Sequence, residues 1–325
     1  MATRRPFRFA VSAPTHVPSR REWTDAIRRI EGMGFDAVVV ADHFTDGYDL
    51  EPIVALTTAA SVTSTLRLQT GVLGNDYRHP VLVARVAAAL DALSDGRFVL
   101  GMGAGWMASD YHAAGISLDS PGARVDRFTE AVAVVKGLLR GEPFSFAGSH
   151  YMINELTIAP QPVQRPHPPV FLGGGSPRVL RLAGREGQIV GVNASLAAGR
   201  LGSHAVLDLR AKRVAEKLGW VREGAAAAGR DFADLELEMN HWLVRITNST
   251  SDAHEFLAKI AARYEVTPEV LAESPSVLVG TVEQCADTLH ARREEYGFSY
   301  LQLDAGFAPK DLSSLAPLIA RLAGT

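Results

Sequence analysis

Short apolar runs alternate with longer stretches of helical period along almost the whole chain. Several of these runs are continuous in Val, Ile, Leu and Phe, which is typical of parallel strands that are buried on both faces. The predicted strands are Phe7–Ser12, Ala37–Ala41, Leu66–Leu73, Phe98–Gly103, Pro169–Gly173, Ile189–Asn193, Leu235–Ile246 and Tyr300–Asp304. Eight strands separated by helices favour an α/β fold of the closed (β/α)8, or TIM barrel, type, and an open doubly wound sheet is the alternative.

The stretches between the strands predict amphipathic helices. Between Val125 and Leu139, for example, apolar residues recur every three or four positions for four turns. Further helices are predicted around Trp23–Ile30 and at Pro52–Ser61, Pro80–Leu93, Pro177–Arg185, Leu207–Ala228, Val282–Tyr296 and Leu312–Leu322. Because no linker separates two such series, residues 1–325 are predicted to form one barrel domain.

Two segments interrupt the alternation. Trp106–Arg124 follows the fourth predicted strand, where a barrel carries functional loops. Gly141–Pro168 is an insertion before the fifth strand and contains an apparent hairpin at Phe144–Tyr151, followed by a stiff proline-rich tail. Both segments are expected to shape a substrate pocket, with Trp106 and Tyr151 as candidate walls.

Charge and composition exclude several classes of protein. The 325 residues carry a net charge of −3 without a basic run, so nucleic acid is not an expected partner. No apolar run approaches the roughly 20 residues of a membrane helix, and the N-terminus has no signal-peptide core. Cys285 is the single cysteine and the histidines are scattered, so neither a disulfide nor a metal site is expected. These features fit a soluble protein of the reducing cytoplasm.

An acidic and a basic side chain follow the second predicted strand. Function in a barrel gathers where strands end, and Asp42 and His43 stand at such an end. A carboxylate and an imidazole there suit cofactor hydrogen bonding and proton transfer. The alternative is that Asp42 caps a turn and that His43 is an ordinary surface residue.

Glycines mark the ends of the third and fourth strands. Gly71 and Gly74 enclose Val72, which indicates either a bulge close to a flat ligand or a plain tight turn. From Gly101 to Trp106 every second residue is glycine, including Gly103 and Gly105, so backbone could approach a ligand closely. As a dinucleotide-binding fingerprint this spacing is weak.

The fifth strand leads into Gly173, Gly174, Gly175 and Ser176, which Pro177 follows at the start of a helix. Glycines leave the backbone N–H groups accessible, Ser176 can cap the helix, and a helix N-terminus favours an anion. The loop is therefore predicted to bind phosphate, and an ordinary capped turn is the alternative.

Taken together, these motifs resemble the bacterial luciferase-like superfamily and, within it, the coenzyme F420-dependent oxidoreductases. The resemblance covers nearly the whole chain and rests on Gly34–Phe44, Leu66–Val72, His79-Pro80, Leu90–Trp106, Pro168–Gly174, Val279–Gln284 and Tyr296-Gly297. It implies a (β/α)8 barrel whose insertion before strand five partly covers the mouth, and commonly a homodimer.

The resemblance also implies roles for individual residues. Asp42 and His43 would contact the deazaflavin F420 and serve in proton transfer, and a non-prolyl cis peptide at Gly71–Val72 would support its ring. Gly173–Ser176 would receive the cofactor phosphate. Gly103, Gly105 and Trp106 complete the expected cofactor site.

The sequence thus predicts an oxidoreductase that transfers hydride between F420 and a small organic substrate with an activated C=C, C=N or carbonyl group. An FMN-dependent luciferase-like monooxygenase, which shares the barrel, is the alternative within the enzyme class. A non-catalytic cofactor-binding protein is the alternative from another class, because fold does not prove activity.

Overall fold

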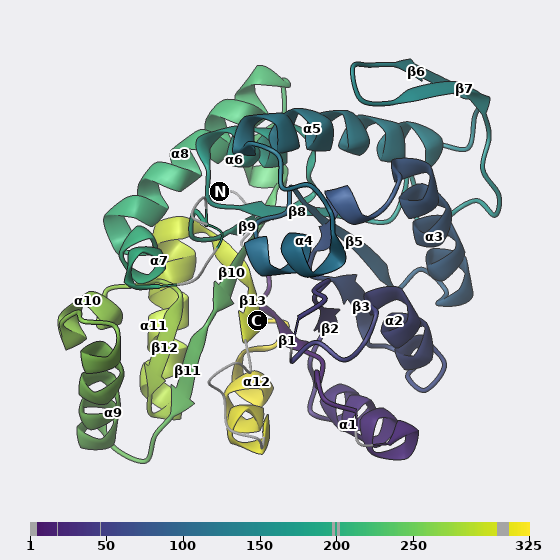
Figure 1. Ribbon diagram of the computed structural model, residues 1–325. Coiled ribbons are helices and arrows are strands. Elements are labelled where there is room, and N and C mark those ends of the chain that lie inside the picture. The colour runs from purple at the N-terminus through teal and green to yellow at the C-terminus, as the bar shows by residue number, and fades with distance from the viewer. Residues whose placement is uncertain (1–4, 18, 46, 197–198, 200–201, 304–311) are drawn as a thin grey trace.

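Eight parallel strands close into a barrel in the computed structural model, which describes residues 5–17, 19–45, 47–196, 199, 202–303 and 312–325 (Figure 1). They are β1 (Arg8–Ser12), β2 (Ala37–Val40), β3 (Arg67–Thr70), β5 (Phe98–Gly103), β8 (Val170–Gly174), β9 (Ile189–Val192), β10 (Glu236–His241) and β13 (Phe298–Leu303). Each strand pairs in parallel with the next, and β13 pairs with β1. The closed barrel is therefore confirmed, and the alternative of an open sheet is wrong.

Helices cover the outside of this barrel, as the apolar periodicity predicts. They are α1 (Arg20–Gly32), α2 (Pro52–Ala60), α3 (Pro80–Leu93), α5 (Pro121–Leu138), α6 (Pro177–Glu186), α8 (Ala211–Ala227), α11 (Val282–Tyr296) and α12 (Ala316–Leu322). Short 310 turns lie at η1 (Asn75–Tyr77), η2 (Phe232–Asp234) and η3 (Leu312–Leu315). Within the described chain, no helix is both long enough and apolar enough to span a membrane.

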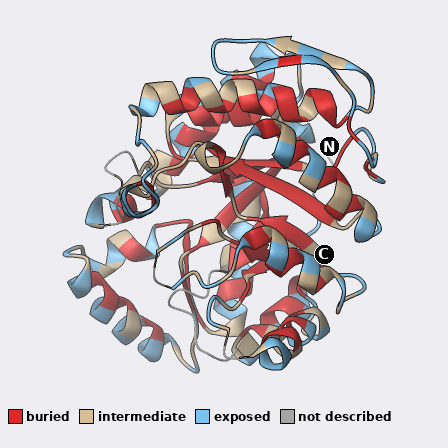
Figure 2. Cartoon of the chain, turned by 45° about the vertical axis from the view of Figure 1, so that its right-hand side comes forward, coloured by how far each residue is buried: buried red, intermediate tan, exposed pale blue. Residues whose placement is uncertain are grey.

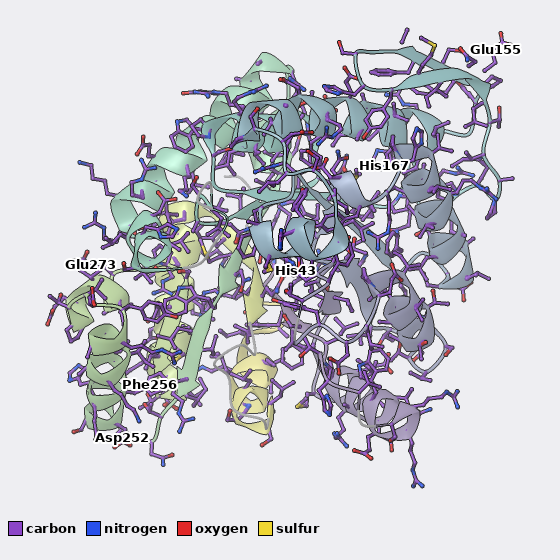
Figure 3. All side chains as sticks on the ribbon, in the orientation of Figure 1. His43, Glu155, His167, Asp252, Phe256 and Glu273 are labelled. Atoms are coloured by element: carbon purple, nitrogen blue, oxygen red, sulfur yellow. The ribbon has the colours of Figure 1, made fainter. Side chains whose placement is uncertain are left out.

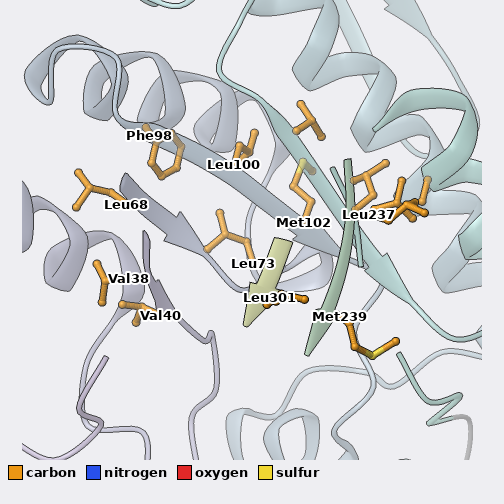
Figure 4. Close-up of a cluster of buried hydrophobic side chains, with 14 of the residues drawn as sticks. Val38, Val40, Leu68, Leu73, Phe98, Leu100, Met102, Leu237, Met239 and Leu301 are labelled. Atoms are coloured by element: carbon orange, nitrogen blue, oxygen red, sulfur yellow. The ribbon is translucent and has the colours of Figure 1, made fainter. Parts of the chain in front are cut away.

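The core has two layers because successive strand residues point to opposite faces. Outward side chains such as Val38, Leu68 and Leu100 pack beneath the helices (Figure 4). The inward side chains form a separate cluster at Ala10, Ala37, Val39, Val99, Phe171, Ile189 and Tyr300. Figure 2 shows the barrel strands buried and the outer helix faces exposed. The long apolar runs of the sequence reflect this burial on both faces.

One predicted strand proves to be two. The run Leu235–Ile246 divides into β10, which belongs to the barrel, and β11 (Leu243–Ile246), which leaves it and pairs with β12 (Val277–Gly280). With α9 (Thr250–Arg263) and α10 (Pro268–Ala272), these two strands form what we call the β11–β12 lobe. The lobe buries Leu257, Ile260, Leu271 and others in a core of its own.

One predicted helix is also divided. The range Leu207–Ala228 contains the end of α7 (Ser203–Asp208) and the whole of α8, with Leu209 and Arg210 between them. Arg210 has an extended backbone, and α8 starts only after it. The apolar period therefore continues across a break in the backbone hydrogen bonding.

The insertion before the fifth barrel strand forms a hairpin of β6 (Phe144–Ala147) and β7 (Met152–Leu156). Its tip is fastened to α5, where the Glu130 carboxylate accepts the backbone N–H groups of residues 149–151 at 2.8–3.1 Å. Figure 1 shows the hairpin on the outer side of α5. The prediction that the insertion partly covers the mouth is therefore wrong for this hairpin. The short helix α4 (Ala108–Ala114), from the segment Trp106–Arg124, lies over the mouth instead.

Candidate active site

His43 lies where β2 ends, at the centre of the barrel mouth and beside α4 (Figure 3). Its Nδ1 is 2.5 Å from Oδ2 of Asp110, a carboxylate on α4 that has no solvent exposure. An ionised carboxylate can only accept hydrogen bonds, so we assign the proton of this bond to Nδ1. The other ring nitrogen, Nε2, is then the one that can exchange a proton with a ligand.

Asp110 binds three consecutive residues that follow β2. Besides the His43 ring, it accepts the backbone N–H of Phe44 and the hydroxyl of Thr45, both at 3.1 Å. The Tyr77 hydroxyl faces the same carboxylate, and burial followed by the charges of Asp110 and Asp42 raises the pKa of Tyr77. The phenol therefore stays a hydrogen-bond donor at neutral pH. A single buried carboxylate thus fixes the position of the candidate proton-transfer group.

Aromatic rings flank His43. The ring centroid of Tyr48 is 4.5 Å from that of the imidazole, and that of Trp106 is 5.7 Å away in an edge-on arrangement. The chain reaches Trp106 through Gly105, whose φ of +74° is rarely adopted by other residues. A Cβ at Gly105 would also lie 1.9 Å from the Tyr111 hydroxyl. Glycine at this position thus allows Trp106 to reach the candidate catalytic histidine.

Asp42 does not pair with His43, although the two are adjacent in the sequence. Its buried carboxylate forms a two-pronged ion pair with Arg78, of which the Nη2–Oδ1 bond measures 3.1 Å. It also accepts the backbone N–H of Gly74 at 2.9 Å. Asp42 therefore fastens β4 (Leu73–Gly74), the short strand beyond the third barrel strand, to the end of β2.

The peptide bond between Gly71 and Val72 is cis, as the resemblance implies. Val72 is partly buried and packs on the inward cluster of the barrel. Gly103 faces it from β5, and a Cβ there would lie 2.5 Å from a methyl group of Val72. The glycine of β5 thus makes the room that the Val72 side chain occupies in the upper layer of the barrel.

The loop Gly173–Ser176 joins β8 to α6. Pro177 takes the first position of the helix, and the Ser176 side chain forms no capping hydrogen bond. The hydroxyl group and the N-terminal N–H groups of this ten-residue helix can therefore receive an anion.

Close backbone packing fixes this glycine loop. A Cβ at Gly175 would lie 2.3 Å from the backbone of Ala194 and Ser195, which follow β9. The Ser195 N–H donates to Asp208 at 2.7 Å, and Asp208 in turn pairs with Lys217 at 2.6 Å. Lys217 has no exposed side-chain surface, and burial lowers its pKa. The segment after β9 is thereby held in place against Gly175.

The mouth therefore brings together most of the predicted residues. His43, Val72, Gly103, Trp106 and the glycine loop all stand at strand ends on the same rim. Tyr151 is not among them, because it packs on His79 with ring centroids 5.4 Å apart. There it lines a cavity of about 400 Å³ together with Asp76, Tyr77 and Arg127, and Trp106 is not part of that lining. That Tyr151 forms a wall of the substrate pocket stays a prediction.

Comparisons with known proteins place the chain in a family. Residues 6–300 match the family described as luciferase-like monooxygenase, so the chain belongs to this family. Its relatives differ in the cofactor that their names mention. The chain is 32% identical over 185 residues to an F420-dependent glucose-6-phosphate dehydrogenase of Kineococcus radiotolerans, a match that covers 55% of this chain and 53% of that protein. The chain thus spans about half the length of this relative.

A second relative points to a different activity. The chain is 30% identical over 306 residues to 4-hydroxyprotoasukamycin monooxygenase of Streptomyces nodosus subsp. asukaensis, covering 85% of this chain and 76% of that protein. Among solved structures, monooxygenase RslO1 from Streptomyces bottropensis superposes with a TM-score of 0.75 at 24% identity, covering 97% of this chain and 98% of that one. That likeness supports the fold. The chain is therefore a member of the luciferase-like monooxygenase family, and its activity and cofactor are left to be proposed.

Proposed function

We propose that this protein is an oxidoreductase that uses the deazaflavin F420 for hydride transfer to or from a small organic substrate. The observation that carries the proposal is the His43–Asp110 pair at the mouth, next to Trp106. It supplies an oriented proton donor or acceptor, which a hydride transfer to a C=C, C=N or carbonyl group requires.

The mouth residues fit a flat cofactor that carries a phosphate. Glycine at position 103 leaves Val72 as the side chain that can support a ring, and Trp106 stands beside His43. Ser176 has a hydroxyl without a capping bond, and the α6 N-terminus has backbone N–H groups for the phosphate. When bound there, a deazaflavin would accept or donate hydride at a ring carbon and would activate oxygen poorly.

In this proposal, different residues of the mouth transfer the proton, position the transferring group and exclude water. Nε2 of His43 would give a proton to the substrate or take one from it, while Asp110 holds the ring in position through Nδ1. Trp106 and Tyr48 would exclude water around this nitrogen. We propose that Asp42 acts by fixing the turn that carries Val72, because Arg78 and the Gly74 N–H already occupy its oxygens.

An FMN-dependent luciferase-like monooxygenase is the second candidate. The specific observation in its favour is that the relative matched over 85% of this chain is named a monooxygenase. The same barrel mouth, with its ring support and phosphate loop, would suit FMN, which also combines a flat ring with a phosphate.

A titration of the purified protein with F420 and, in parallel, with FMN tests the two candidates by fluorescence. We expect micromolar or tighter binding of F420 and weaker binding of FMN. The reverse preference would assign the protein to the flavin monooxygenases. Binding of neither would refute the cofactor assignment itself. If F420 binds but His43→Ala leaves turnover at the parental rate, the protein is better described as a cofactor-binding protein.

We further propose that the protein is a cytoplasmic homodimer that pairs through α2 and α3. Residues 52–66 contain no charged side chain. Val54 on α2 is 62% exposed, and Leu82 and Leu93 on α3 are 53% and 75% exposed. Such a mainly apolar face, which also includes the exposed Arg85, suits a protein partner better than water. Sedimentation of the parent and of Leu82→Glu tests the dimer, because a buried glutamate would shift the variant to monomer.

A further inference from the structure

A groove of about 550 Å³ runs between α5 and α6, outside the barrel and apart from the site described above. Its lining residues are Val125, Asp126, Thr129, Glu130, Ser149, His150, Arg178, Arg181, Leu182 and Arg185. Both helices begin at the mouth end of the barrel, after β5 and β8 respectively, and the hairpin tip borders the groove. The groove therefore starts in the first turns of α5 and α6, at the end of both helices that lies nearest the mouth.

The α6 wall of the groove is cationic. Arg178, Arg181 and Arg185 follow one another at intervals of three and four residues, which places them on one face of the helix. Two of their carboxylate partners are exposed, namely Asp126 for Arg178 and Glu223 at 2.7 Å for Arg181, and the third, Glu186 at 3.1 Å from Arg185, is half-buried. Pairs of this kind are weak, so the carboxylate of a ligand can replace or share these partners.

The α5 wall contributes less negative charge than its sequence implies. Asp126 is already paired with Arg178. Burial works to raise the pKa of Glu130, but the backbone N–H groups of the hairpin tip outweigh it and lower that pKa. The same N–H groups and the neighbouring His150 partly compensate the negative charge that Glu130 presents to the groove. Three guanidinium groups therefore dominate the electrostatics of the groove.

The groove begins next to the proposed phosphate loop. Arg178 stands in the first turn of α6, two positions after Ser176, and its Nη1 lies 3.4 Å from the carbonyl oxygen of Gly122 in the first turn of α5. A chain that leaves a phosphate on the glycine loop in the outward direction would thus meet Arg178 first. Arg181 and Arg185 follow at about 4.5 Å and 10.5 Å from Arg178 along the helix axis, given a rise of about 1.5 Å per residue.

The two candidate cofactors differ at this point. FMN ends at its phosphate, whereas a deazaflavin of the F420 type continues beyond the phosphate into a chain of glutamyl units, each with a carboxylate. We propose that the α5–α6 groove binds this oligoglutamyl chain through Arg178, Arg181 and Arg185. The inference rests on the proposed function, because it assumes that the cofactor phosphate lies on the Gly173–Ser176 loop.

The test compares two forms of F420, one with several glutamyl units and one with none, in fluorescence titrations of the parent and of the double variant Arg181→Ala/Arg185→Ala. In the parent we expect the long form to bind about tenfold more tightly at low ionic strength, and the advantage to shrink in high salt. The double variant is expected to bind both forms equally. Arg181→Lys/Arg185→Lys keeps the charge and is expected to retain most of the advantage.

Arg20→Ala/Arg21→Ala is the matched control, because it also removes two positive charges and both arginines are exposed on α1, on another side of the barrel. It is expected to leave the preference unchanged. If the parent binds both forms of F420 equally, the groove inference is overturned while F420 binding, and with it the proposed function, still stands. If the parent binds FMN and neither form of F420, both proposals are overturned.

Discussion

On the β2 and β3 side of the mouth, charged side chains hold the site through buried pairs, whereas on the β8 and β9 side backbone packs against backbone. The Asp110 carboxylate holds the His43 ring through a hydrogen bond, and Arg78 holds the Asp42 carboxylate through an ion pair. Across the mouth, Gly175 lies directly on the backbone that follows β9, and the Lys217–Asp208 pair supports that backbone from outside. The first side presents a group that reacts, and the second presents N–H groups that bind. We therefore expect substitutions on the β2 and β3 side to lower turnover, and substitutions on the β8 and β9 side to lower stability and cofactor affinity.

The largest effect is expected from removal of the proton-transfer group. His43→Ala should lower the turnover of the cofactor about 10²–10⁴-fold, the usual range for general acid–base catalysis. The affinity for the cofactor phosphate should change little, because the glycine loop is not touched. Turnover and binding are both followed by cofactor fluorescence. His254→Ala, in the exposed part of α9, is the control. A parallel loss of affinity and turnover would show that His43 serves binding instead.

The second largest effect is expected on stability, from removal of the Lys217 ammonium group that supports the β8 and β9 side of the mouth. Lys217→Met removes the buried partner of Asp208, while Arg213 still pairs with that carboxylate at 3.0 Å, so the loss of unfolding free energy should be about 1.5–3 kcal/mol. Lys212→Met on the same helix is the control, because Lys212 is exposed. Urea unfolding measures both variants. Equal stabilities would mean that the pair does not support the segment after β9.

A smaller effect is expected when a single methyl group is added to the glycine loop. Gly175→Ala would place a Cβ 2.3 Å from the neighbouring backbone, so the loop must shift at a cost of about 1–3 kcal/mol. Binding of a phosphate-bearing cofactor should weaken as well. Gly219→Ala on α8 meets nothing within 4 Å and should stabilise the fold by about 0.5–1 kcal/mol. Thermal unfolding in the presence and absence of cofactor distinguishes the two substitutions.

The smallest expected effect depends on pH. Burial works to raise the pKa of Asp208, but the bonds from Lys217 and the Ser195 N–H outweigh it, so the pKa lies below its ordinary value of 3.8. A carboxyl group with a lowered pKa stabilises the fold above its ordinary pKa, and this contribution is lost as the pH falls through the folded value. The stability gap between the parent and Asp208→Asn should therefore narrow below about pH 4. Urea titrations at pH 7 and pH 3 measure this gap, and a constant gap would contradict the prediction.

The sequence predicted the barrel well because strands buried on both faces leave continuous apolar runs. The predicted β8–α6 loop was found as well, since glycines followed by serine and proline mark the start of a helix. Asp110 was missed because its seven-residue helix has too few apolar residues to show a period. Arg78 and Lys217 were missed for another reason: each acts on a residue that is distant in the chain, and local patterns do not contain such pairs.

The β11–β12 lobe escaped prediction because β10 and β11 read as one strand. Leu257, Ile260 and Leu271 pack there in a cluster separate from the barrel core. A segment with its own core can open as a separate cooperative unit. Amide hydrogens of α9 and α10 should then exchange with solvent without global unfolding of the barrel. In this respect α9 and α10 would unfold as a cooperative unit of their own, while the barrel that carries the candidate active site stays folded.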